Sequence, residues 1–231
     1  LRIPSVRGKI LNQKRKDQLL NGITTDVAKY LQRLDKTHHN TCVHSICTAY
    51  YALWIFENLN LDVAESIIIQ GALLHDIGKS RIPYSVINKN GRLTAWEREL
   101  INKHPLYGAQ ILNADNNIRK EVVEIALYHH ERMNGSGYPF GVSTIPPEIS
   151  VVSMADVYEA LTGKREYKKA YSHEEAISVL DLAAAQNILP DQLCNIMRNE
   201  MPLNETERQT LYALAMKTCS AMEKIYGEKD I

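Results

Sequence analysis

The sequence predicts an all-α protein, a helical bundle, and three observations lead to this fold class. Apolar residues recur at helical spacing over most of the 231 residues, and no stretch keeps the alternation of a β-strand. Capping boxes, in which Thr or Ser precedes Glu by three positions, occur at Thr94–Glu97 and Ser172–Glu175. Proline and glycine stand where helices would begin and end.

The expected elements follow from these signals in chain order. Helices are expected at about 14–36, 41–59, 62–78, 94 onward, 120–130, 146–163, 172 onward and 204–227. Two loops separate them, at 82–93 and at 131–147, and the second carries three Gly and three Pro. Long loops inside compact domains are often functional, which makes the second loop a candidate for part of a site.

The chain is expected to have three parts. An N-terminal helical segment covers 1–37, a catalytic domain covers 38–188, and a C-terminal helical extension covers 189–231. The extension is expected either to pack on the catalytic domain or to form a homodimer contact. Its apolar stripe is more typical of ordinary core, and it consists of Leu211, Leu214, Ala215 and Cys219.

Composition excludes several classes of protein. Lys plus Arg and Asp plus Glu both number 27, so nothing indicates binding to a nucleic-acid polymer. The four cysteines form no Cys-x-x-Cys pair, which favours reduced thiols in a cytoplasmic protein. No apolar run reaches membrane-spanning length, so no membrane segment is expected in this chain.

The pair His75-Asp76 is the strongest chemical signal. It closes a very apolar run at 67–74. A buried aspartate is costly unless it is paired or binds a cation. A metal ion meets that need and also accepts neutral imidazole nitrogens. The pair therefore predicts a metal site.

Other polar residues interrupt apolar helices in the same way. Asp156 follows the apolar run 151–155, His129 and His130 close another helix, and His44 lies inside a third. The histidines among these residues can also be interpreted as purely structural rather than as metal ligands. His44 can be a hydrogen-bonded core histidine, and the histidine pair can complement a helix C-terminus. Taken together they favour one cation centre, because each leaves polar groups that the others can satisfy.

The remaining histidines give weaker signals. His104 precedes Pro105 near a helix end and says little by itself. His38, His39 and His173 are better interpreted as surface or capping residues.

Two segments resemble a known family. The run from His75 to Lys79 reads His-Asp-Ile-Gly-Lys, the signature of the HD superfamily of metal-dependent phosphohydrolases. The run from His129 to Pro139 reads His-His-Glu-Arg-Met-Asn-Gly-Ser-Gly-Tyr-Pro and resembles the defining segment of the HD-GYP branch. The similarity extends over about 38–183 and includes the motifs around His104 and Asp156.

The resemblance implies an HD-superfamily helical bundle with an additional C-terminal helical segment. It implies a phosphodiesterase that hydrolyses cyclic di-GMP to linear pGpG or to GMP. It also implies two divalent metal ions, iron or manganese first, with zinc or nickel as alternatives. A hydroxide bridging the ions is the expected nucleophile. The implied ligands, with Asp76 shared by both ions, are His44, His75, Asp76, His104, His129, His130 and Asp156.

Five residues are predicted to contact substrate: Lys79, Tyr138, Glu159, Arg165 and Lys168. Lys79 is predicted to neutralise the phosphate or assist proton transfer, or else to complete a helix C-terminus. The planar guanidinium of Arg165 and the compact ammonium of Lys168 both suit a phosphate ligand. The alternative is that both residues lie at a solvated helix end. Tyr138 is expected to contact substrate or to pack its loop against the core.

The sequence also departs from the family pattern. Asn40 replaces a Glu that some members use for a third ion, which favours two ions here. Glu159 stands where Asp is frequent, and Gly163-Lys164-Arg165 stands where Ser-Asp-Arg is commoner. An HD-type enzyme for another cyclic dinucleotide or a nucleoside monophosphate therefore stays open. So does a nucleotide-binding signalling module with little catalysis, which the additional helices at both ends suggest.

Overall fold

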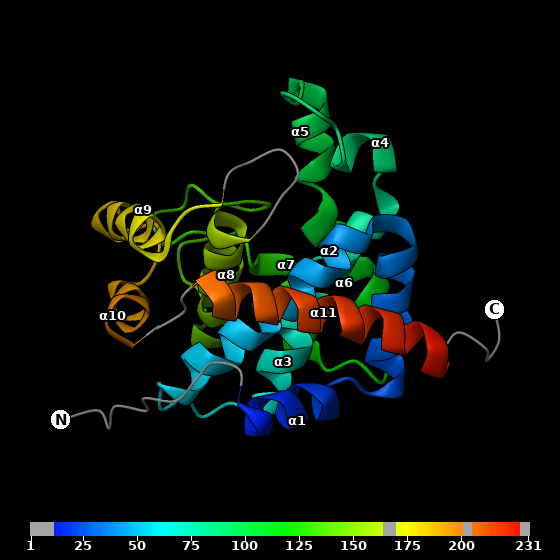
Figure 1. Ribbon diagram of the computed structural model, residues 1–231. Coiled ribbons are helices and arrows are strands. Elements are labelled where there is room, and N and C mark those ends of the chain that lie inside the picture. The colour runs from blue at the N-terminus through cyan, green and yellow to red at the C-terminus, as the bar shows by residue number, and fades with distance from the viewer. Residues whose placement is uncertain (1–11, 164–169, 201–204, 227–231) are drawn as a thin grey trace.

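The computed structural model describes residues 12–163, 170–200 and 205–226, and the elements of this part of the chain are all helical (Figure 1). The all-α prediction is confirmed. In order the elements are α1 (Gln13–Gly22), α2 (Thr25–Glu57), α3 (Glu65–Leu74), the 3-10 helix η1 (Ile77–Arg81), α4 (Tyr84–Ile87), α5 (Ala95–Ile101), α6 (His104–Leu112), α7 (Lys120–Tyr128), α8 (Pro147–Thr162), α9 (His173–Ala185), α10 (Asp191–Glu200) and α11 (Glu205–Tyr226).

Helix α2 is the centre of the bundle. Every residue from Thr41 to Ile55 is buried, so this stretch has no solvent-facing side. Helices α3, α8 and α11 pack against it, and Figure 1 shows α11 lying across it. A helix buried on all sides must be covered by several neighbours. Helix α7 packs on α3, α6 and α8, so these helices meet around the region where the predicted site lies.

The first two expected helices differ from the structure. The expected helix at 14–36 is divided, because α1 ends at Gly22 and Thr24 caps a new helix, α2. The break predicted at 37–40 is present as a point of non-helical backbone inside α2. A kink at His38 (φ −148°, ψ 75°) turns that side chain inward. His38 is buried, with Nε2 3.0 Å from the main-chain oxygen of Ile82. The prediction of a surface His38 is therefore wrong, because the kink gives the ring a partner that the sequence does not indicate. The division at 37/38 stays a prediction.

The third expected helix is shorter than predicted. α3 ends at Leu74 rather than near Gly78, and η1 follows after His75 and Asp76. A Cβ atom on Gly78 would lie 1.9 Å from the main-chain oxygen of His104. Gly78 therefore lets η1 approach the backbone of α6 directly. This close approach, rather than a helix stop, brings His104 next to the His75-Asp76 pair.

Several other boundaries agree with the sequence, whereas α6 and α10 were not among the expected helices. Both predicted capping boxes are formed, and α8 has Pro146 and Gly163 as its two caps. The loop predicted at 82–93 contains the short helix α4. The stripe of α11 is core, since Leu211, Ala215 and Cys219 are buried and Leu214 is partly buried.

Two further facts concern the thiols and the helix lengths. All four cysteines are free and buried. Among the described helices, none has both the length and the apolar character needed to cross a membrane.

Candidate metal centre

The predicted histidines and aspartates converge, although they are distributed over more than a hundred positions of the sequence. They come from the interior of two helices, α2 and α8, and from the ends of three others, α3, α6 and α7. All except His130 are buried, and His130 is partly exposed. The converging side chains are those of His44, His75, Asp76, His104, His129, His130 and Asp156.

Asp76 lies at the middle of this cluster. Its Oδ1 is 3.2 Å from Nε2 of His104 and 3.9 Å from Nε2 of His129. Its Oδ2 is 3.5 Å from Nε2 of His75 and 3.8 Å from Nε2 of His44. The two carboxylate oxygens therefore face two different pairs of histidines.

Asp156 and His130 complete the two sides. Oδ1 of Asp156 is 3.0 Å from Nε2 of His44 and 3.8 Å from Nε2 of His75. On the other side, His130 joins His104, His129 and Asp76 in a group whose ligand atoms all lie within 4.8 Å of one another. His44, His75 and Asp76 form a second group of the same compactness. Asp76 belongs to both groups.

Three of the rings are oriented by the main chain. Nδ1 of His75, His104 and His129 lies 2.7, 2.8 and 3.0 Å from the carbonyl oxygen three positions earlier. A neutral imidazole that donates from Nδ1 keeps its lone pair on Nε2. Each ring therefore turns a lone pair toward Asp76, as the ligands of a metal ion do.

The residues fit a cation better than they fit one another. Nε2 of His75 is buried without any hydrogen-bond partner. Nε2 of His104 and Nε2 of His129 are only 3.1 Å apart, although both rings already donate from Nδ1. Two neutral rings in this arrangement place lone pairs face to face. A shared cation removes that repulsion and gives the orphaned nitrogen a partner.

The charges agree with this interpretation. Burial by itself raises the pKa of Asp76, but Lys79 and His75 outweigh it and bring that pKa well below its usual range. Burial, reinforced by the neighbouring His75 and His104, brings the pKa of His129 well below its usual value. The aspartate is thus ionised and His129 neutral at neutral pH, which are the states that bind metal.

His44 shows the opposite tendency. Burial lowers its pKa, but the carboxylates of Glu159 and Asp156 outweigh burial and raise that pKa to about 9. Without a metal, a second proton is held on Nε2 of His44, which faces Asp156. A divalent cation at Nε2 would take the place of that proton and supply one further unit of positive charge.

Lys79 reaches the cluster from η1. Its Nζ lies 2.5 Å from Oδ2 of Asp76, and its side chain is 21% exposed. The ammonium therefore touches the central carboxylate and also faces solvent. This position is compatible with a role toward a phosphate and with a role as the partner of Asp76.

Tyr138 lies beside the histidines. Its ring stacks on His130, with centroids 4.5 Å apart and planes at 23°, and its N–H donates to the carbonyl of His130 over 3.2 Å. A Cβ on Gly137 would lie 2.4 Å from the Cα of Glu131, so this part of the loop packs tightly on the residues after His130. Tyr138 thus packs its loop against the cluster, and its substrate contact stays a prediction.

Glu131 holds this loop, and our sequence interpretation missed it. The side chain is buried, and its carboxylate accepts hydrogen bonds from the N–H groups of Phe140 (2.7 Å), Gly141 (3.2 Å) and Val142 (3.0 Å). The signal available in the sequence was the position of Glu131, an acidic residue that directly follows the histidine pair at the start of a glycine-rich loop.

Arg132 was also missed, and it fixes the end of α7 against α8. Its Nη1 donates to the carbonyl of His129 (2.9 Å) and to Oγ of Ser153 (2.9 Å). Oγ of Ser153 in turn donates to the same carbonyl over 2.8 Å. Because Ser153 lies one turn before Asp156, this network sets the distance between the His129 and Asp156 parts of the cluster.

The role of Glu131 leads to a stability prediction. Replacing Glu131 by Gln keeps the shape but turns an NH₂ group toward a main-chain N–H. We expect the free energy of unfolding to fall by about 2 kcal/mol, the size of a hydrogen bond to a buried charge. Urea denaturation measures this change, and amide exchange should be faster over 138–142. The matched control is Glu124→Gln on the surface of α7. A loss no larger than that of the control would show that the clamp is unimportant.

The remaining predicted residues lie in different places. Glu159 is buried, and its carboxylate accepts a hydrogen bond from Nδ1 of His44. Asn40 is exposed and belongs to none of the compact groups found among the described residues. Arg165 and Lys168 lie outside the described residues.

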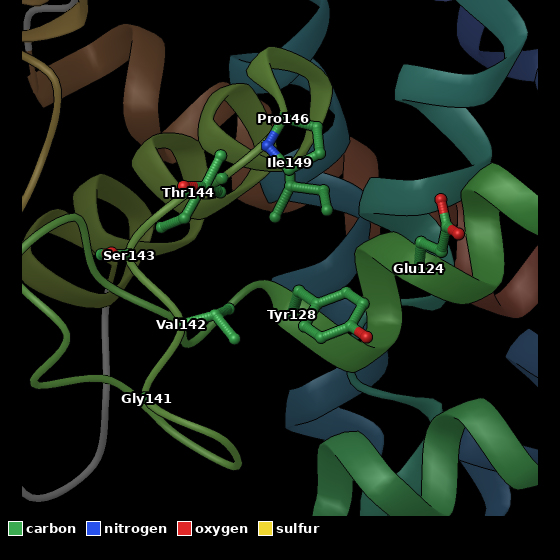
Figure 2. Close-up of a pocket in the computed structure, with 9 residues that line it drawn as sticks. Glu124, Tyr128, Gly141, Val142, Ser143, Thr144, Pro146 and Ile149 are labelled. Carbon is green, nitrogen blue, oxygen red and sulfur yellow. The ribbon is translucent and has the colours of Figure 1, made fainter.

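A separate cavity of about 550 Å³ lies between the end of α7 and the start of α8 (Figure 2). Glu124, Tyr128 and Ile149 line it, together with the loop at 141–146. None of its lining residues belongs to the cluster of histidines and aspartates.

Comparison with known proteins agrees with this geometry. A family model described as HD domain matches residues 19–191. A cyclic di-GMP phosphodiesterase of Pseudomonas aeruginosa is 34% identical over 183 residues, which cover 74% of this chain and 43% of that protein. A 3'3'-cGAMP-specific phosphodiesterase of Vibrio cholerae is 37% identical over 139 residues, which cover 58% of this chain and 27% of that protein.

Solved structures are also similar in fold. One of them is the HD domain of the Listeria monocytogenes phosphodiesterase PgpH in complex with cyclic-di-AMP, with a TM-score of 0.55 and 20% identity, covering 88% of this chain and 99% of that one. The present chain spans less than half the length of the two curated relatives.

Proposed function

Because the chain belongs to the HD domain family, we propose that it is a metal-dependent phosphodiesterase that hydrolyses cyclic di-GMP to linear pGpG or to GMP. The observation that carries the proposal is the cluster around Asp76, whose two oxygens face two groups of histidines. The Pseudomonas aeruginosa relative supports the choice of substrate, since it is named as a cyclic di-GMP phosphodiesterase.

The proposed centre holds two divalent ions, iron or manganese, because mixed imidazole and carboxylate ligands suit these metals. His44, His75 and Asp156 would hold one ion, and His104, His129 and His130 the other, with Asp76 as the ligand of both. Such a pair of ions supplies positive charge to a phosphodiester and lowers the pKa of a water molecule.

The chain itself supplies the remaining functions. Lys79, at the border between Asp76 and solvent, neutralises the phosphate or delivers a proton to the leaving oxygen. Tyr138, whose ring stacks on His130, lies beside the centre and is the predicted substrate contact of its loop. Arg165 and Lys168 remain the predicted phosphate contacts. Cytoplasmic location, predicted from the reduced cysteines, is part of the same proposal.

A second candidate is hydrolysis of another cyclic dinucleotide. The relative in Vibrio cholerae, which is named as specific for 3'3'-cGAMP, favours this alternative. Both candidates need the same metal centre and differ only in the bases that the site accepts.

One assay tests the function and separates the candidates. The protein is purified under reducing conditions, loaded with Mn(II) or Fe(II), and given cyclic di-GMP, 3'3'-cGAMP and cyclic di-AMP in competition. We expect linear pGpG or GMP to form first, and a chelator to stop the reaction. Preference for 3'3'-cGAMP would favour the second candidate. Failure to cleave any of the three with either metal would contradict both.

A further inference from the structure

His44 is oriented differently from the other buried histidines of the cluster. Its Nε2 faces Asp156 at 3.0 Å, while its Nδ1 donates to the carboxylate of Glu159 and not to a main-chain carbonyl. His44 lies in the middle of α2, where main-chain carbonyls are occupied by the helix itself. A side-chain acceptor is therefore needed to fix this ring, and Glu159, one turn after Asp156 on α8, provides it.

Gly163 provides the space for that carboxylate. A Cβ atom on Gly163 would lie 2.4 Å from Oε1 of Glu159, 2.9 Å from its Cδ and 2.7 Å from its main-chain oxygen. Gly163 has a φ of −68°, which any residue adopts, so its glycine is required by space and not by backbone conformation. The two departures noted in the sequence, a Glu at 159 and a Gly at 163, therefore meet in one contact. The carboxylate of the longer acid occupies part of the space that a side chain at 163 would need.

We propose that Glu159 is a positioning residue of the metal centre and that Gly163 is the residue that permits it. This inference rests on the proposed function, because it requires a metal at His44. The Glu159 carboxylate holds His44 in the tautomer whose Nε2 lone pair faces the cluster, and it increases the basicity of that nitrogen. The role differs from the substrate contact predicted for Glu159 from the sequence.

The test is a cycle of four proteins: wild type, Glu159→Asp, Gly163→Ala and the double variant. Mn(II) affinity is measured by calorimetric titration without nucleotide. Each single variant is expected to weaken one of the two Mn(II) sites by about 10–100-fold, the usual effect of removing a partner of a metal ligand. Aspartate is too short to fill the space, and alanine displaces the glutamate.

In the double variant the shorter acid removes the contact between the added methyl group and the carboxylate, while the contact with the main-chain oxygen of residue 159 remains. We expect it to recover at least part of the lost Mn(II) affinity, so that the two losses are not additive. Thermal unfolding of all four proteins checks that they are folded. Glu159→Gln keeps the length and one acceptor oxygen, and it is expected to lie between wild type and Glu159→Asp in Mn(II) affinity.

Two results would overturn the proposal. The first is unchanged Mn(II) affinity in both single variants. The second is unchanged affinity together with a raised KM for the nucleotide in Glu159→Asp, which would restore the substrate-contact interpretation. Absence of turnover by the wild type would contradict the proposed function but would leave the Mn(II) measurements valid. The two failures are therefore distinguishable.

Discussion

Replacing Asp76 by asparagine is expected to remove bound metal and to lower kcat/KM by about 10³-fold or more, the effect of losing several kcal/mol of charge stabilisation. Asp76 belongs both to the group with His104 and to the group with His44, with Oδ1 near His104 and Oδ2 near His75. The neutral amide of asparagine is a weak metal ligand, so one substitution affects both sides of the centre.

Metal content and turnover are measured together for this variant. Elemental analysis of anaerobically purified protein is expected to fall from about two ions per chain to less than one, the pattern of a two-metal site that has lost its shared ligand. The matched control is Asp62→Asn, since Asp62 is exposed and lies outside the cluster. A variant that keeps both ions and most of its activity would contradict the assignment of Asp76.

Replacing Lys79 by methionine is expected to lower kcat/KM by about 10²–10³-fold while the metal content stays at the wild-type level. Loss of a positioned charge at a reacting phosphate has an effect of this size. Methionine keeps most of the length and the apolar stem but removes the ammonium that lies 2.5 Å from Asp76. Arginine at this position keeps the charge, so Lys79→Arg should retain more activity than Lys79→Met.

The metal content decides between the two interpretations of Lys79. If Lys79 served only as the partner of Asp76, metal content and activity would fall in parallel in Lys79→Met. Arg81→Met is the matched control, because Arg81 lies in the same 3-10 helix and contacts Gln110 on the outer surface. Activity equal to that of this control would show that Lys79 has no catalytic role.

Much of the fold could be predicted because its signals are local. The capping boxes at Thr94 and Ser172 and the caps Pro146 and Gly163 depend on neighbouring residues alone, and all are formed. The break near His38 was expected from the sequence, but the burial of its ring was not, since that depends on a carbonyl from Ile82, forty-four positions later. Such a tertiary partner leaves no trace in helical periodicity.

The candidate site also contains residues that the sequence indicates and residues that only the fold reveals. Acids and histidines on apolar helices indicate the cluster in the sequence, because a buried charge is costly unless it is paired or binds a cation. The residues that orient the cluster carry no comparable signal. Glu131 acts on main-chain N–H groups, and Gly163 acts by lacking a side chain. Glu159 could be recognised as unusual, but only the fold shows that its carboxylate meets His44.

The proposed centre requires two ions that share Asp76, and anomalous diffraction from crystals of the Mn(II)-loaded protein tests this. We expect two peaks on either side of the Asp76 carboxylate, one beside His44, His75 and Asp156 and the other beside His104, His129 and His130. Crystals of loaded protein with no peak next to Asp76, or with manganese bound only elsewhere, would contradict the account.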